Sequence, residues 1–293
     1  MPPLPDETQV AIARAAAAVI ALPINALFTP CRAGHPLNPS FPLTIDAARA
    51  ELRRMALAPR PLERPVVVCA GIFDPGTGAR VLAARLRRLT TTPERVLALG
   101  FWSCRTFDDC RAAVARLVNA RFPAPSHDET TPLDAIGVSM GGLVARAAAT
   151  PPDNRAPSAI PRLNIRRLFT LGTPHHGAAW WDRAPWDERA AHMKPGSPFI
   201  RSLNVRWLAD HHHAHPRAYP IHAYARLGDQ IVGESNAAAP DGRLWWLPNP
   251  ADELAHVQAF DDPRMLADIA RRLRAEPPLS YPPCAPLPAP NAR

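Results

Sequence analysis

A Gly-x-Ser-x-Gly sequence between an apolar run and an alanine-rich segment constrains the fold more than any other feature of this chain. Residues 133–136 read as a buried strand, Gly137-Val138-Ser139-Met140-Gly141 as a tight turn, and residues 143–149 as a helix. A serine on such a turn is held clear of the backbone, and the glycines are needed because neighbouring chains come close. The N–H groups at the start of the following helix suit an anionic oxygen. Ser139 is therefore a candidate nucleophile.

Apolar, strand-like runs alternate with helix-like segments over most of the chain. We expect strands at 65–70, 95–102, 133–138, 165–171, 221–226 and 243–247, and helices at 78–89, 107–119, 143–149 and 263–274. This alternation predicts an α/β fold, with a mostly parallel central sheet and helices on both faces. Ligands bind at the carboxyl ends of the strands in such sheets. Ser139, Thr173 and Asp229 each follow an expected strand.

The overall composition excludes one class of partner. Of the 293 residues, 47% are hydrophobic and 20% are charged, which suffices for one α/β domain with a large core. The formal net charge is +8, but the arginines are scattered and no basic run with interleaved aromatic residues occurs. We therefore expect no nucleic-acid partner. A weak attraction to anionic membranes stays open.

Three regions are expected along the chain, partly from the distribution of its 37 prolines. Residues 1–64 are expected to form an N-terminal apolar helix and a proline-rich extension, and residues 65–276 the α/β domain. Residues 277–293 are expected to form a proline-rich tail that is either disordered or lies along the surface.

The apolar N-terminal segment allows three interpretations. Residues 10–28 are apolar except for Arg14, Pro23 and Asn25, and no Lys or Arg precedes them. A signal peptide needs a basic start, and a membrane-spanning helix would have to bury Arg14. A packed or peripheral helix fits better than either. The expectation is peripheral membrane contact through this helix and a cytoplasmic or membrane-associated location rather than secretion.

Cysteine and histidine usage predicts neither a metal site nor a cofactor. The five cysteines include no Cys-x-x-Cys pair, and Cys69 lies in an apolar strand. Cys104 and Cys110 could form a disulfide in an oxidising compartment, which the sequence does not decide. The histidines at 211–213 and 215 are expected to be a solvated polar stretch rather than a set of metal ligands.

A serine hydroxyl needs a base and an orienting carboxylate before it can act as a nucleophile at neutral pH. The chain order Ser, Asp, His of the known hydrolase triads makes Asp229 the candidate acid and His256 the candidate base. Asp241 and Asp252 compete with Asp229, but neither follows a strong strand. The alternative is that these are unrelated loop residues and that Ser139 is a surface serine.

Several segments together resemble serine lipases and esterases of the α/β-hydrolase superfamily, in the lipase-like branch. The likeness extends over roughly residues 65–274 and rests on VVVCAGIF (66–73), GVSMGG (137–142), LGTPHHG (171–177), KPGSPFIRSLN (194–204), the loop 227–232 and His256 before the last helix. Two residues depart from the pattern, because Ala70 and Val138 stand where histidines are usual. Neither belongs to the triad.

The resemblance implies ester hydrolysis by Ser139, Asp229 and His256, without a cofactor. It implies an oxyanion hole made by the backbone N–H of Met140 and that of Ile72, or of Phe73 if the loop is offset by one residue. A lid is expected at about 178–200, with Trp180 and Trp181 as candidate substrate-binding residues. The alternative for the tryptophans is that they only pack this segment onto the core.

The substrate implied by the resemblance is a small-molecule or lipid ester. Amide or thioester hydrolysis on the same triad is an alternative, because acyl transfer uses the same groups. A non-catalytic, membrane-associated binding protein that has kept the fold is a second alternative. The sequence leaves the oligomeric state open.

Overall fold

The computed structural model describes residues 36–150, 160–183, 187–250 and 253–288. Within them, a six-stranded sheet has the order β2-β1-β3-β4-β5-β6, and every neighbouring pair is parallel. The strands are β1 (Val66–Cys69), β2 (Val96–Leu99), β3 (Leu133–Val138), β4 (Ile165–Leu171), β5 (Ile221–Arg226) and β6 (Trp245–Leu247).

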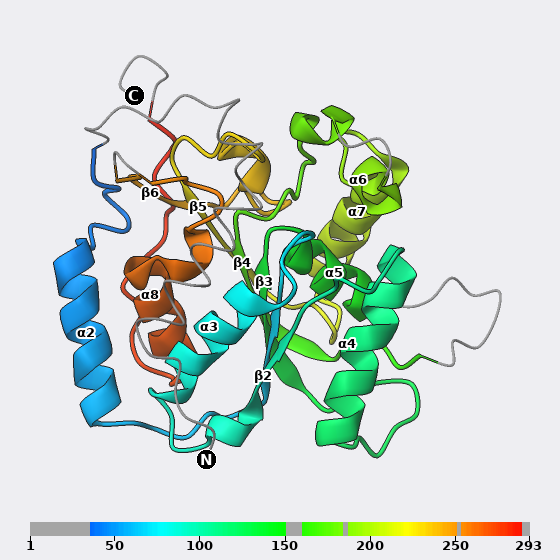
Figure 1. Cartoon of the computed structure of the whole chain (residues 1–293), viewed down its shortest axis with the longest axis horizontal. Helices are drawn as coiled ribbons and strands as arrows, with labels where there is room; N and C mark the ends of the chain where they lie inside the picture. The colour runs from blue at the N-terminus through cyan, green and yellow to red at the C-terminus, as the bar shows by residue number, and fades with distance from the viewer. Residues whose placement is uncertain (1–35, 151–159, 184–186, 251–252, 289–293) are drawn as a thin grey trace.

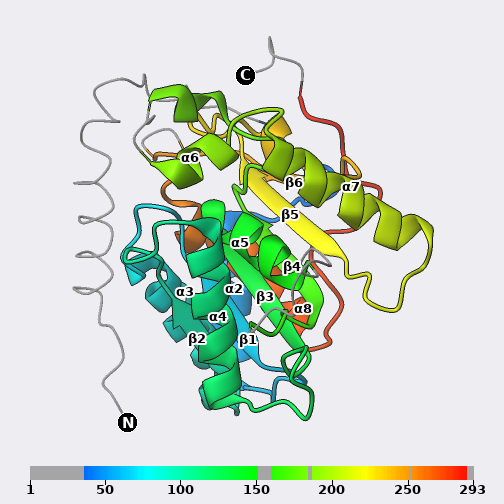
Figure 2. The same ribbon diagram turned by 90° about the vertical axis from the view of Figure 1, so that its right-hand side faces the viewer.

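Helices cover both faces of this sheet (Figure 1). One face carries α2 (Ile45–Leu57), α3 (Thr77–Arg87) and α8 (Pro263–Leu273), and the other carries α4 (Phe107–Arg121), α5 (Met140–Ala149) and α7 (Pro198–His212). Figure 2 shows α4, α5 and α7 from the side that they cover. Shorter helical turns are η1 (Pro93–Arg95), η2 (Ala179–Arg183), α6 (Glu188–His192), η3 (Ser235–Ala237) and η4 (Ala259–Asp261). The predicted α/β fold is confirmed.

The alternating side chains of the central strands divide the core between the two helical layers. In β1, Val66 and Val68 pack with the α2, α3 and α8 layer, and Val67 and Cys69 pack with the α4 and α5 layer. All four are buried, as expected for a parallel strand with helices on both faces. Full burial of such a side chain contributes roughly 1.5–3 kcal/mol, so the core holds β1 and β3 firmly at the centre of the sheet.

The chain reverses its direction of travel across the sheet at β1. From β1 it moves outward to β2, and then returns to place β3 on the opposite side of β1. Such a switch point leaves a crevice at the carboxyl ends of the two central strands, where ligands bind in open parallel sheets. Gly71 follows β1 and Ser139 follows β3, so this edge is where a site is expected.

Two helices were not foreseen from the sequence. Helix α2 starts at the Thr44 cap, whose hydroxyl accepts from Ala47 N–H, but it buries only Ala48 and Met55. Its apolar stripe is therefore too narrow to stand out as a helical pattern. Helix α7 starts with Pro198 after the Ser197 cap and buries Ile200, Leu203 and Trp207, which have helical spacing.

Residues on either side of the predicted α/β domain also belong to the packed unit. Helix α2 packs on α8, and Phe41 is buried in the same core layer. In the tail, Ser280 is buried against α8. Its N–H donates to the Asp268 carboxylate at 2.9 Å, and the N–H of Leu279 donates to the same carboxylate at 2.5 Å. Residues 277–288 thus lie along the surface and are fastened to α8.

The predicted helix at 10–28 lies outside the described residues, so membrane contact through it stays a prediction. Among the helices that the structure does describe, none is long and apolar enough to cross a membrane.

Candidate active site

Ser139 occupies a strained turn between β3 and α5. Its backbone angles are φ 51° and ψ −123°, which a residue with a Cβ rarely adopts and which cost on the order of 1–3 kcal/mol. Two hydrogen bonds hold it there: Ser139 N–H donates to Leu171 O at 2.8 Å, and Thr173 Oγ donates to Ser139 O at 2.8 Å. The turn therefore fixes the direction of the Ser139 hydroxyl.

The glycines around Ser139 are required by close backbone packing. A Cβ on Gly141 would overlap the Cys69 carbonyl oxygen, and a Cβ on Gly137 would overlap the backbone of Gly142. Strand β1, strand β3 and helix α5 can approach this closely only without those side chains. The start of α5 is thus pressed against the end of the central strand.

Asp229 lies just beyond β5, with its carboxylate buried. Its Oδ1 accepts from the N–H groups of Ile231 at 3.0 Å and Val232 at 2.9 Å, and its Oδ2 lies 2.8 Å from His256 Nδ1. Burial alone would raise the pKa of Asp229, but His256 and the two N–H donors outweigh it and hold the pKa below its ordinary value. The carboxylate is therefore ionised and can only accept hydrogen bonds.

His256 connects the other two residues. Its Nε2 lies 2.9 Å from Ser139 Oγ, and its imidazole is 12% exposed. Because the Asp229 carboxylate can only accept, the Nδ1 atom of His256 carries a proton, and in the neutral ring Nε2 is free to accept from the Ser139 hydroxyl. Ser139, His256 and Asp229 thus form one hydrogen-bonded series, although they lie far apart in the sequence.

Gly172 allows the imidazole and the carboxylate to meet. It has φ +58°, and a Cβ there would lie 3.2 Å from His256 Nδ1 and 3.3 Å from Asp229 Oδ2. A larger residue would crowd the hydrogen bond between His256 and Asp229. The sequence contained a signal for this role, because Gly172 directly follows a buried strand at the edge where the candidate residues gather.

Buried charges anchor the loop that carries His256. Arg226, at the end of β5, pairs with Glu253 and lies 3.1 Å from Asp262. Asp262 also accepts from Arg264 Nε at 3.0 Å. Arg226 precedes Asp229 in the chain, and Glu253 and Asp262 lie on either side of His256, so one guanidinium ties the strand of the acid to the loop of the base. Sequence reasoning missed Arg226, although a charged residue ending an apolar strand was visible.

The expected oxyanion residues lie at the switch point of the sheet. A Cβ on Gly71 would be 3.4 Å from Ser139 Cβ, so the loop after β1 passes directly beside the nucleophile. Ile72 is buried and Phe73 is partly buried. Met140 is the first residue of α5, where backbone N–H groups have no partner within the helix. The choice between Ile72 and Phe73 as second donor stays open.

Asp74 fixes the shape of this loop. Its Oδ1 accepts from Gly76 N–H at 2.8 Å and Thr77 N–H at 2.6 Å, which caps the start of α3. Sequence analysis did not assign a role to Asp74. The turn-forming run Asp74-Pro75-Gly76 was the signal available.

The two candidate substrate-binding tryptophans belong to η2. Trp181 is 2% exposed and its ring centroid lies 6.1 Å from that of Phe73, while Trp180 is half-buried and meets Trp181 edge-on at 4.9 Å. Within the expected lid, Lys194 and Asp182 form an exposed ion pair at 2.9 Å that joins the end of the segment to η2. Trp181 therefore packs between this segment and the loop after β1.

Asp241, and His222 within β5, have other partners in the structure. Asp241 pairs with Arg243 at a turn, and Asp252 lies outside the described residues. His222 stacks on Phe169 inside the sheet, and burial lowers its pKa to about 3, which keeps it neutral. Asp241 and His222 therefore contribute to a turn and to the core.

His211 and the cysteines at 104 and 110 have local partners. His211 Nδ1 bonds to Trp207 O at 2.8 Å, and among the described residues no group of three or more His, Cys, Asp or Glu side chains gathers around a metal-sized space. Cys104 and Cys110 are buried free thiols in contact with one another.

No protein-family model and no curated protein sequence matches this chain. Among solved structures, phospholipase PlaB from Legionella pneumophila, in complex with thio-NAD, is 15% identical with a TM-score of 0.44, covering 59% of this chain and 43% of PlaB. The Bacillus licheniformis lipase BlEst2 is 17% identical with a TM-score of 0.42, covering 76% and 94%. The epoxide hydrolase CorEH is 17% identical with a TM-score of 0.36, covering 74% and 93%. These neighbours are hydrolases, and the likeness concerns the architecture alone.

Proposed function

We propose that this protein is a serine hydrolase that cleaves carboxylic esters, as lipases and esterases do. The observation that carries the proposal is the hydrogen-bonded series from Ser139 Oγ to His256 to Asp229, at 2.9 and 2.8 Å. A buried carboxylate, an imidazole and a hydroxyl on a strained turn form the arrangement that makes a serine nucleophilic. The sequence motifs that resemble serine lipases support an ester as the substrate.

In this mechanism, Ser139 Oγ attacks the ester carbonyl carbon while His256 Nε2 takes the hydroxyl proton. Asp229 holds the imidazole in place and stabilises its positive charge. When the tetrahedral intermediate collapses, His256 gives the proton to the leaving alcohol and an acyl-enzyme forms. Water, deprotonated by His256, then attacks the acyl carbon and releases the acid and free Ser139.

The negative oxygen of the intermediate is stabilised by backbone N–H groups. Met140 supplies one donor from the start of α5, and Ile72 or Phe73 supplies the other. Each such donor contributes about 3 kcal/mol in the transition state.

Phe73 of the loop after β1 and the lid residues Trp180 and Trp181 are proposed to form an aromatic wall for the acyl chain, the lid being at about 178–200. Their ring contacts next to the candidate oxyanion loop support this assignment. A rise in activity above the solubility limit of the substrate would indicate that the lid opens at a lipid surface, and simple saturation would contradict that.

Replacing Ser139 tests the proposal directly. We expect Ser139→Ala to lower kcat for p-nitrophenyl butyrate by roughly 10⁶-fold, as expected for loss of a catalytic serine. Ser202→Ala, on the exposed side of α7, is the matched control and should retain activity. A fluorophosphonate probe should label the native protein and the control but not Ser139→Ala. Full turnover by Ser139→Ala would overturn the mechanism.

A panel of ester, thioester and amide substrates with the same acyl group separates the acyl-transfer alternatives. The proposal expects the ester to be cleaved with the highest kcat/KM. Faster cleavage of the thioester or amide would keep the triad and change the substrate class. Absence of both labelling and turnover would instead favour a binding protein.

A further inference from the structure

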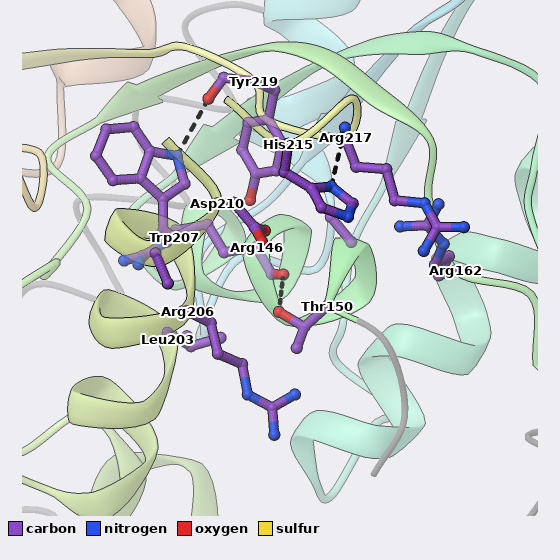
Figure 3. A pocket seen from close by; sticks show the side chains of 12 residues that line it. Arg146, Thr150, Arg162, Leu203, Arg206, Trp207, Asp210, His215, Arg217 and Tyr219 are labelled. Carbon is purple, nitrogen blue, oxygen red and sulfur yellow. Dashed lines mark hydrogen bonds between the residues drawn. The ribbon is translucent and has the colours of Figure 1, made fainter. Parts of the chain in front are cut away.

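A cavity lies away from the candidate active site, at the end of α5 opposite Ser139. Its volume is about 250 Å³, and it is bounded by the end of α5, the second half of α7 and the segments that lead into β4 and β5 (Figure 3). Ser139, Asp229 and His256 are not among its lining residues. The charged residues that line it are Arg146, Arg162, Arg206, Asp210 and Arg217.

The described residues that line this cavity include more arginines than carboxylates. Four of them are arginines, and one, Asp210, carries a carboxylate. Behind the wall, Glu129 pairs with both Arg162 and Arg217, so one carboxylate serves two guanidinium groups. Figure 3 shows these two guanidinium groups next to one another at one side of the cavity. The cavity therefore has a net positive lining.

Arg146 is the most unusual of these cations, because it is 1% exposed and bonds only to neutral acceptors. Its Nη1 lies 3.0 Å from His175 Nδ1, its Nη2 donates to Asn204 Oδ1 at 2.8 Å, and its Nε has no hydrogen-bond partner within the described residues. Burial lowers its pKa to about 10, so it stays charged at neutral pH. Buried cations are normally paired with carboxylates.

The neighbours of Arg146 cannot supply the missing negative charge. Burial and the nearby Arg146 hold the pKa of His175 far below its ordinary value, so this imidazole is neutral. Tyr219, whose hydroxyl faces Arg146, is itself buried, and burial raises its pKa to about 12. An anion in the adjoining cavity would provide the compensation that the described residues lack.

We propose that this cavity binds a phosphate monoester. Guanidinium groups match the geometry of phosphate oxygens and form bidentate, charge-assisted hydrogen bonds with them. The cavity volume of about 250 Å³ leaves room for an organic group beside the phosphate. Trp207 and Tyr219 also line the cavity and offer apolar surface for a small organic group.

Calorimetric titration of the full chain with glycerol 3-phosphate tests this assignment, with glycerol as the uncharged reference. We expect glycerol 3-phosphate to bind, and its affinity to fall as salt rises, because partly exposed charges are screened. Glycerol should not bind. The Ser139→Ala protein should bind equally well, so the result does not depend on the proposed hydrolysis.

A double variant locates the site. Arg206→Gln combined with Arg217→Gln removes two lining cations and should weaken binding at least roughly ten-fold, because charge-assisted hydrogen bonds to the phosphate are lost. Arg116→Gln with Arg201→Gln removes the same charge from exposed positions on α4 and α7 and should leave the affinity within about two-fold of native. Equal losses in the two proteins would overturn the assignment.

Vesicles distinguish the source of the phosphate group. Binding of glycerol 3-phosphate in solution would assign a soluble ligand, whereas binding only to phosphatidic acid vesicles, and not to phosphatidylcholine vesicles, would assign a lipid headgroup. Both results support a phosphate monoester at the cavity. Failure to bind either form at millimolar concentration overturns the proposal.

Discussion

The two halves of the candidate active site are held in place by different forces. On the Ser139 side, backbone segments pack so closely that glycine is required at 137 and 141. On the side of Asp229 and His256, a buried guanidinium, that of Arg226, joins the strand of the acid to the loop of the base. The first half depends on shape, and the second depends on charge.

This difference separates the expected responses to mutation and to pH. Close packing does not change with protonation, so the turn at Ser139 should tolerate acid as long as the fold persists. The ion pairs around His256 lose strength when their carboxylates are protonated. The acid–base half is therefore expected to fail first at low pH.

Asp229→Asn should have the largest effect among the variants that test this comparison. An amide can stabilise the wrong imidazole tautomer and cannot balance the imidazolium, and the corresponding change in serine proteases lowers kcat by about 10⁴-fold. Steady-state kinetics with p-nitrophenyl butyrate measure the effect, and circular dichroism checks the fold. A loss below ten-fold would show that Asp229 does not orient His256.

Asp262→Asn should come next, through stability. This carboxylate is buried and faces both Arg226 and Arg264, so its removal takes the ion-pair partner from Arg264 and one of two from Arg226. Breaking a buried ion pair in this way costs on the order of 3–5 kcal/mol. Urea unfolding of native and variant proteins measures the loss. A change below 1 kcal/mol would mean that Glu253 alone compensates Arg226.

The same variant tests the response to acid. Burial raises the pKa of Asp262, but Arg264 and Arg226 outweigh it and leave the folded-state pKa below the ordinary value. Its contribution to stability is thus full above the unfolded-state pKa of about 3.9 and is lost as the pH falls through the lower folded value. The native protein should lose more stability than Asp262→Asn between pH 5 and strongly acidic pH. Parallel curves would contradict this.

Gly141→Ala should have a smaller effect that does not depend on pH. The added Cβ overlaps the carbonyl oxygen of Cys69, so backbone must move, and overpacking of this kind costs about 1–3 kcal/mol. Thermal unfolding at pH 5 and pH 8 should show the same loss. Gly196→Ala is a control for the added methyl group, because a Cβ there meets nothing within 4 Å, although its φ of +69° adds some backbone strain.

Thr173→Val should have the smallest effect. It removes the hydrogen bond from Thr173 Oγ to Ser139 O, worth about 1 kcal/mol, and leaves the side chain close to its original size. We expect a several-fold lower kcat with an unchanged pH profile, measured against native protein. A shift of the pH profile would indicate that this bond acts through His256 instead.

The sequence was most informative where local chemistry and position agree. The fold class was predicted from apolar runs that alternate with helix-like segments. Ser139 and Asp229 were predicted from their places after strands, and His256 from the order of the three residues in the chain. Helix α2 was not predicted because two buried residues in thirteen give little periodicity. Arg226 and Gly172 were missed, although a charged residue and a glycine at the ends of apolar strands were visible, because their roles depend on which loops meet in space.

The attachment of the tail to α8 has a consequence for shortening the protein. The proline content of residues 277–293 makes them look dispensable, yet Asp268 accepts hydrogen bonds from the backbone of Leu279 and Ser280 as well as from Tyr224 in the sheet. Cutting the chain at residue 276 would remove three hydrogen-bond donors from the buried Asp268 carboxylate, namely the N–H groups of Leu279 and Ser280 and the Ser280 hydroxyl. Deleting the tail would therefore weaken the support of Asp268 for Tyr224 in β5, the strand that leads to Asp229.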